Sequence, residues 1–128
     1  MENQVYSMPR IGDKAPSFKA KTTQGEINFP GDFQGKWKIL FSHPADVTPV
    51  CTTEFISFAK MQAEFEALNT QLVGLSVDSL SSHIAWVRNI QEKIEWEGEK
   101  NIEIGFPIIV DLSKAVSKLY GMIMPGEA

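Results

Sequence analysis

Cys51 has the most distinctive chemistry in this sequence, because it is the only cysteine among 128 residues. It lies in the stretch of residues 41–55, which reads FSHPADVTPVCTTEF and also contains one of the two histidines, His43. A cysteine thiolate is a nucleophile, a redox-active group and a metal ligand, whereas a buried thiol behaves as a small hydrophobic side chain. The residues around Cys51 therefore decide which of these roles the sequence favours.

The residues immediately before Cys51 are typical of a helix start. Thr48 is a suitable N-cap, and Pro49 suits the first helical position, where its missing N–H group costs nothing. Cys51 would then lie in the first turn, near unpaired backbone N–H groups and the positive end of the helix dipole. Both favour the thiolate and lower the pKa of the thiol below its free value of about 8.5. The same N–H groups would bind an anion or a peroxide oxygen.

Two further side chains near Cys51 could act on its thiolate. Glu54 lies one helical turn later on the same face, where its carboxylate opposes ionisation of the thiol unless a cation lies between them. Glu54 could instead be a carboxylate that the helix N-terminus stabilises. Pro44 has no N–H group and could shield the sulfur from water without hydrogen-bonding to it. The stretch therefore predicts an activated thiolate, with the hydroxyl of Thr48 at the same edge of the turn.

The remaining sequence predicts a single α/β domain, spanning residues 1–128, that would position this stretch. Apolar runs predict strands, and apolar side chains spaced three and four residues apart predict helices. In chain order we expect a hairpin of residues 18–22 and 27–29, strand 37–42, helix 49–69, strand 71–77, a helix of residues 79–94 that begins at Ser79 or Ser81, strand 106–110, and a short helix that begins at Asp111 or Ser113 and ends at Tyr120. This alternation predicts a mainly parallel sheet. Ligands bind such sheets at the carboxyl ends of strands, which is where the stretch around Cys51 follows its strand.

Composition and charge argue against several classes of function. The formal net charge is −4 and the isoelectric point is about 5.1, so no basic surface for nucleic acid is expected. No apolar run approaches the roughly 20 residues that span a bilayer, and residues 1–4 have no signal-peptide character. One cysteine cannot form an internal disulfide, which together with the missing signal predicts a cytoplasmic location. We expect neither nucleic acid nor a membrane among the partners.

The residue types around Cys51 closely resemble the active-site signature of the peroxiredoxins, the alkyl hydroperoxide reductase/thiol-specific antioxidant family. The centre of the signature is Pro44-x-x-x-Thr48-x-x-Cys51. Further matching blocks extend the resemblance over nearly the whole chain: Ala15-Pro16-x-Phe18, Leu75-Ser76-Val77-Asp78, His83-x-x-Trp86 and Phe106-Pro107-Ile108-Ile109-Val110-Asp111. Within the family, the sequence is most similar to the subfamily that includes the one-cysteine enzymes.

The resemblance implies a thioredoxin-like fold and a thiol peroxidase that reduces hydrogen peroxide or alkyl hydroperoxides. Cys51 would attack the terminal peroxide oxygen, become a sulfenic acid and release water or an alcohol. An external thiol, either thioredoxin-like or small, would then reduce Cys51, since the sequence has no second cysteine. The resemblance also implies that no metal, haem or flavin is used, so we expect no cofactor. The family commonly forms dimers and larger rings, which predicts a homo-oligomer.

The resemblance also implies roles for the neighbours of the peroxidatic thiolate. Thr48 would hydrogen-bond the peroxide, and the backbone N–H group of Val50, with that of the cysteine itself, would bind the leaving oxygen. Pro44 would shield the sulfenate from further oxidation. Glu54 would orient the catalytic arginine of the family, and His43 matches a histidine that lines the site in this subfamily.

The catalytic arginine of the family has no match in this sequence. The only arginines are Arg10 and Arg88, and neither lies at the family's position. We expect the strand that carries the arginine to follow residue 128, with the last strands and helix of the fold also missing. Strand 37–42 would then be an apolar edge that favours association. A chain truncated in this way would be a weak peroxidase.

Several of these residues have alternative interpretations. Instead of being an enzyme, the chain could be a truncated thioredoxin-like domain whose Cys51 senses oxidants or whose exposed edge mediates association. Cys51 as a metal ligand has little support, because only His43 is close to it in sequence. His43 could be a structural histidine that hydrogen-bonds the backbone. His83, on a helix with an apolar face, is expected to be a surface or packing residue.

Overall fold

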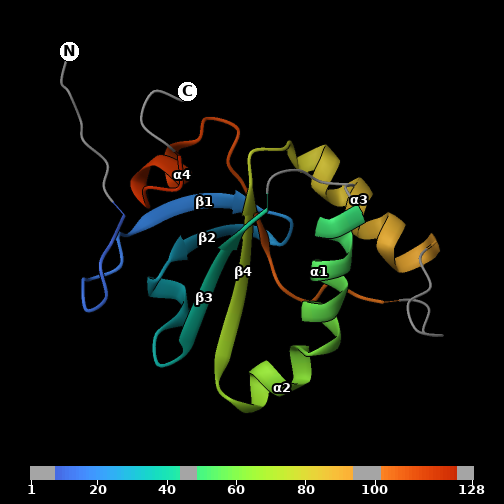
Figure 1. Cartoon of the computed structure of the whole chain (residues 1–128), viewed down its shortest axis with the longest axis horizontal. Coiled ribbons are helices and arrows are strands. Elements are labelled where there is room, and N and C mark those ends of the chain that lie inside the picture. The colour runs from blue at the N-terminus through green and yellow to red at the C-terminus, as the bar shows by residue number, and fades with distance from the viewer. Residues whose placement is uncertain (1–7, 44–48, 94–101, 124–128) are drawn as a thin grey trace.

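The computed structural model of this chain describes residues 8–43, 49–93 and 102–123, without the side chains of residues 49–51 and 93. Its centre is a five-stranded sheet in the order β2-β1-β5-β4-β3 (Figure 1). The strands are β1 (Phe18–Thr22), β2 (Gly25–Phe29), β3 (Trp37–Ser42), β4 (Thr70–Ser76) and β5 (Ile108–Val110). All of the predicted strands are therefore present, with bounds within two residues of those expected.

The sheet combines a parallel part with an antiparallel hairpin. β3, β4 and β5 are parallel neighbours, whereas β1 pairs antiparallel with both β2 and β5. The predicted α/β class is confirmed, and the parallel arrangement holds for the three strands that helices connect. Among the described strands, β3 pairs only with β4 and lies at the edge of the sheet, as the sequence predicted.

The predicted helix 49–69 is two helices. α1 (Pro49–Lys60) and α2 (Gln62–Ala67) are separated at Met61, whose φ is −92° and whose ψ is 6°. The N–H group of Met61 is shared between the carbonyl oxygens of Ser57 and Phe58. The apolar spacing continues unchanged across Met61, so the sequence alone did not indicate this break.

The other helices follow the prediction more closely. They are α3 (Leu80–Lys93) and the short α4 (Ala115–Leu119), and the 3-10 turn η1 (Gly31–Phe33) precedes β3. Ser79 is confirmed as the cap of α3, because its Oγ accepts a hydrogen bond from the N–H group of Ser82 at 3.1 Å. Asp111 holds the start of α4 with a buried carboxylate that accepts hydrogen bonds from the N–H groups of the helix. Among the described helices, none has the length and apolar character that a bilayer span requires.

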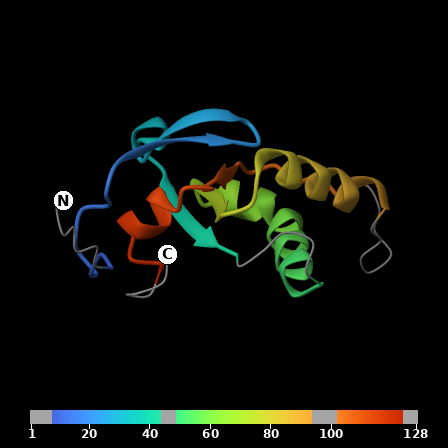
Figure 2. The same cartoon turned by 90° about the horizontal axis from the view of Figure 1, so that it is seen from above.

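Helices cover both faces of the sheet, and Figure 2 shows α4 on one side and α1 with α3 on the other. Alternate residues of β4 and β5 supply the two cores. Leu72 and Ile108 belong to the core beneath α1 and α3, whereas Val73 and Ile109 belong to the core beneath α4 and the hairpin. The continuous apolar runs of β4 and β5 follow from this, since a strand that is covered on both faces has no polar side.

Candidate active site

The structure places the backbone of Cys51 in the first turn of α1. The helix begins at Pro49, so the prediction that Pro49 occupies the first helical position is confirmed. The backbone of Val50 lies in the same turn. Thr48 and Pro44 lie outside the described residues, so the roles predicted for them stay predictions.

Phe55 fixes the position of α1 over the sheet. It lies one helical turn after Cys51, and its side chain is only 1% exposed. A Cβ atom built on Gly74 of β4 would lie 3.2 Å from Cζ of Phe55, so the absence of a side chain at Gly74 gives this ring its space. Phe41 of β3 and Trp86 of α3 contact the same ring, with centroids at 5.4 Å and 4.6 Å. The beginning of α1 is therefore held by three other elements.

A hydrogen bond joins the start of α1 to α3. The indole N–H group of Trp86 donates to Oγ1 of Thr52 at 3.0 Å, and Trp86 is 1% exposed. Thr52 follows Cys51 directly, so this bond fixes the first turn laterally. No role was predicted for Thr52 from the sequence, and only its hydrogen bond to a tryptophan 34 residues away reveals one.

Glu54 lies on α1 with its side chain exposed to solvent. Arg10 pairs instead with Asp13, with 3.9 Å between Nε and a carboxylate oxygen, and Arg88 is an exposed residue of α3. Within residues 8–43, 49–93 and 102–123, no ion pair joins Glu54 to an arginine. The carboxylate is thus available to a cation that approaches from outside this part of the fold.

His43 is a buried residue directly after β3. It is 8% exposed, and its backbone N–H group donates to the carbonyl oxygen of Leu75 at 3.0 Å, which extends the parallel ladder by one residue. Its ring lies 4.7 Å from that of Phe55 and 5.0 Å from that of Trp86, measured between centroids. The ring therefore packs against the same aromatic residues that position the start of α1.

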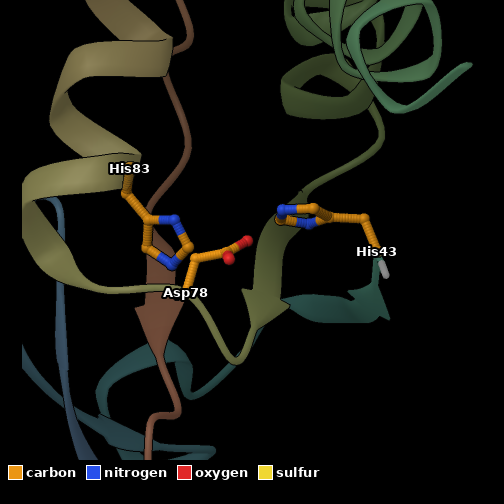
Figure 3. A group of neighbouring side chains, drawn as sticks. All are labelled: His43, Asp78 and His83. Carbon is orange, nitrogen blue, oxygen red and sulfur yellow. The ribbon is translucent and has the colours of Figure 1, made fainter. Parts of the chain in front are cut away.

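His43 also belongs to a cluster with Asp78 and His83. Figure 3 shows the carboxylate of Asp78 between the two imidazole rings and directed toward that of His43. One potential ligand atom from each residue lies within 4.8 Å of those of the other two. His83 is 0% exposed, so the expected surface position is wrong, and the burial agrees with the expected packed position.

This cluster was not predicted from the sequence, although a usable signal was present. β3 and β4 are parallel, and Ser42 lies opposite Leu75 at their carboxyl ends. Residues that follow two neighbouring parallel strands leave the sheet at the same edge. His43 and Asp78 could have been paired on that ground, whereas the approach of His83 requires the position of α3.

A hollow of about 300 Å³ opens beside this edge of the sheet. Its lining includes Ser42 at the end of β3 with His43 directly after it, Ser76 at the end of β4, and Ser117 with Met122 from the α4 region. His43 therefore borders this hollow on the α4 side, although the histidine itself is largely buried.

Comparisons with known proteins agree with the sequence signature. Residues 11–127 match the model of the AhpC/TSA family. A peroxiredoxin of Methanosarcina mazei is 65% identical over 118 residues, which are 92% of this chain and 54% of that protein. A peroxiredoxin of Aquifex aeolicus is 58% identical over 125 residues, which are 98% of this chain and 54% of that protein. The chain thus spans about half the length of the curated relatives it matches.

A solved structure supports the fold. A yeast mitochondrial 1-Cys peroxiredoxin, studied for thiol resolution through the glutathione/thioredoxin systems, matches with a TM-score of 0.80 and 47% identity. The match covers 91% of this chain and 52% of that one. The predicted thioredoxin-like fold of the peroxiredoxin type is therefore confirmed, and the similarity to a one-cysteine protein agrees with the single cysteine of this chain.

The contact between Gly74 and Phe55 leads to a stability prediction. Gly74→Ala should lower the free energy of unfolding by about 2 kcal/mol, because the new Cβ forces the ring of Phe55 and the start of α1 to shift. Urea unfolding followed by circular dichroism measures this change. Gly105→Ala is the matched control, since its Cβ would meet Gln62 at an ordinary 3.6 Å. Equal stabilities of the two variants would show that the close approach at Gly74 is unimportant.

Proposed function

The chain belongs to the AhpC/TSA family, and we propose that it reduces hydrogen peroxide or organic hydroperoxides at Cys51. The observation that carries this proposal is the position of Cys51 in the first turn of α1. The N–H groups of a first turn have no acceptor within the helix, and the helix dipole is positive there. Both stabilise a thiolate, which is the nucleophilic form of cysteine.

The proposed reaction transfers one oxygen atom from the peroxide to sulfur. The thiolate of Cys51 attacks the terminal peroxide oxygen, a sulfur–oxygen bond forms, and the oxygen–oxygen bond breaks. The leaving oxygen carries away the electron pair and takes a proton, which gives water or an alcohol. One external thiol then condenses with the sulfenic acid to form a mixed disulfide and water. A second thiol releases the cysteine, so that two thiols are oxidised for each peroxide reduced.

The backbone geometry supports one further step of this proposal. The N–H groups of Val50 and Cys51 belong to the first turn of α1, where no carbonyl group of the helix can accept from them. A peroxide oxygen that develops negative charge as the bond breaks is a suitable acceptor. In this proposal Thr48 hydrogen-bonds and positions the peroxide, and Pro44 shields the sulfenate from a second oxidation.

Glu54 and His43 are proposed to act around the thiolate rather than on the peroxide bond. The carboxylate of Glu54 opposes ionisation of a nearby thiol unless a cation lies between them. We expect this cation to be the arginine that the family uses, since neither Arg10 nor Arg88 pairs with Glu54 in the described part of the chain. His43 lines the site in this proposal, which is consistent with its ring packing against Phe55 of α1. Residues 1–128 alone should therefore be a weaker peroxidase than a full-length relative.

One observation supports a second candidate function, a redox-sensing or association module. Trp37 and Ile39 lie on the edge strand β3 and are 76% and 40% exposed. An apolar sheet edge favours pairing with another chain or segment. Under the peroxidase proposal, the partners are further copies of the chain in a homo-oligomer and an external thiol reductant. A module that only associates would not require Cys51 to react rapidly with peroxide.

The rate of Cys51 oxidation separates the two candidates. We expect hydrogen peroxide to convert Cys51 to a sulfenic acid at least about 100-fold faster than it oxidises a free thiol, because the helix start stabilises the thiolate and the leaving oxygen. Rapid mixing with a sulfenic-acid trap, followed by intact-mass analysis, measures this rate. Cys51→Ser is the control that must give no adduct. Oxidation no faster than that of a free thiol would favour the association module.

A matched pair of threonine variants tests the positioning role. Thr48→Val should slow peroxide reduction by about 100-fold if its hydroxyl holds the peroxide, since a lost hydrogen bond in the transition state has this magnitude. Thr70→Val makes the same chemical change at the start of β4, at the opposite end of the strand from this edge, and should leave the rate nearly unchanged. Stopped-flow measurement of peroxide consumption compares them. If both variants oxidise at the wild-type rate, Thr48 acts only as a helix cap.

A further inference from the structure

We propose that His43, Asp78 and His83 form a binding site for a divalent transition-metal ion, with Zn²⁺ as the reference ion. The three residues come from the end of β3, the connection after β4, and α3. They include both histidines of the chain. Two imidazoles and a carboxylate are ligands that Zn²⁺ and related ions accept readily. The proposal does not depend on the peroxidase activity, and it excludes Cys51, the residue considered earlier as a ligand.

In this proposal the two ring nitrogens of His83 have different roles, one as a hydrogen-bond donor and the other as a metal ligand. Nε2 of His83 lies 3.1 Å from the carbonyl oxygen of Ile109. A histidine that binds a metal usually donates its other N–H group to such a carbonyl, which fixes both the tautomer and the ring orientation. Nδ1 of His83 is then the atom that would bind an ion in this proposal. The carbonyl group of Ile109 in β5 therefore orients the His83 ring in the way that a metal-binding histidine requires.

Hydrogen bonds to a neighbouring residue also orient the carboxylate of Asp78. The hydroxyl of Ser76 donates to Oδ2 of Asp78 at 2.8 Å, and the N–H group of Asp78 donates back to the serine oxygen at 3.1 Å. Ser76 is 1% exposed, so this pair of hydrogen bonds is protected from water. The orientation of the carboxylate between the imidazole rings in Figure 3 is thus held by a buried neighbour.

The spacing of the three residues is close to what an ion requires. Their ligand atoms lie within 4.8 Å of one another. Ligands held at about 2.1 Å in tetrahedral geometry lie about 3.4 Å apart, so the widest pair would approach by at most about 1.4 Å. Rotations of side chains provide such a movement without displacing a strand. The ring centroids of His43 and His83 are 6.1 Å apart, with the carboxylate of Asp78 between the rings.

A hollow on the α4 side adjoins one residue of this cluster. The described lining of the hollow of about 300 Å³ includes His43 and Ser76 but neither Asp78 nor His83, so solvent comes close to one proposed ligand and to the serine that orients another. A metal site requires an entry path as well as suitable ligands. The competing explanation is a buried hydrogen-bonded cluster that binds no ion, and the two explanations predict different titrations.

Titration of the metal-free protein with ZnCl₂ tests the proposal. Isothermal titration calorimetry should show one ion per chain with a Kd of about 1 µM or lower. Asp78→Asn and His83→Gln should each raise the Kd by at least about tenfold, and Ser76→Ala, which keeps all three ligands, by about tenfold. Asp13→Asn changes an exposed carboxylate in the segment before β1 and should leave the Kd unchanged. Thermal melts establish that each variant is folded.

The NMR signals of the two histidine rings provide a test that needs no variant. Because the chain has two histidines, both of them ligands in the proposal, both ring signals should shift together and saturate at one equivalent of Zn²⁺. No binding below about 100 µM, or unmoved ring signals at saturation, would overturn the proposal in favour of the hydrogen-bonded cluster. Cobalt substitution adds a third readout. A thiolate-to-cobalt charge-transfer band that is lost in Cys51→Ser, with affinity retained in Asp78→Asn, would assign the ion to the cysteine and also overturn it.

Discussion

The packing of Phe55 against the bare backbone of Gly74 is the contact on which the rest of the site depends. A helix start can activate a thiol only if it is held in one place relative to the groups that act with it. Phe55 provides this by lying one turn after Cys51 and inserting its ring where β4 has no side chain. Trp86 then fixes the same turn from α3 through its bond to Thr52. One close approach in the core thus determines where the helix N-terminus lies.

The parallel pairing of β3 and β4 brings the other functional residues to the same edge. Both strands end there, so His43 and Asp78 leave the sheet beside each other and beside the beginnings of α1 and α3. The same geometry explains why this edge contains both histidines of the chain, the predicted nucleophile and a supported carboxylate. A proposed metal site and a proposed peroxidatic centre are neighbours here, because ligand sites of such sheets lie at the carboxyl ends of the strands.

The sequence predicted the parts of this structure that local patterns determine. The strands, the hairpin, the start of α1 at Pro49 and the cap at Ser79 all follow from nearby residues, and the signature around Cys51 identified the family. The break at Met61 could not be predicted, since the apolar period continues across it. The cluster of His43, Asp78 and His83 was missed for another reason. Its members are far apart in the sequence, and only the strand register and the packing of α3 bring them together.

The pH dependence of Cys51 alkylation tests the central claim most directly. Because the chain has one cysteine, the rate of reaction with iodoacetamide reports the thiolate fraction of that residue alone. If the start of α1 stabilises the thiolate, the rate should reach its half-maximum at a pH clearly below about 8.5, the pKa of a free thiol. The denatured protein, measured in the same way, should titrate at the free value. A half-maximum at or above the free value in the folded protein would contradict an activated thiolate and the peroxidase proposal with it.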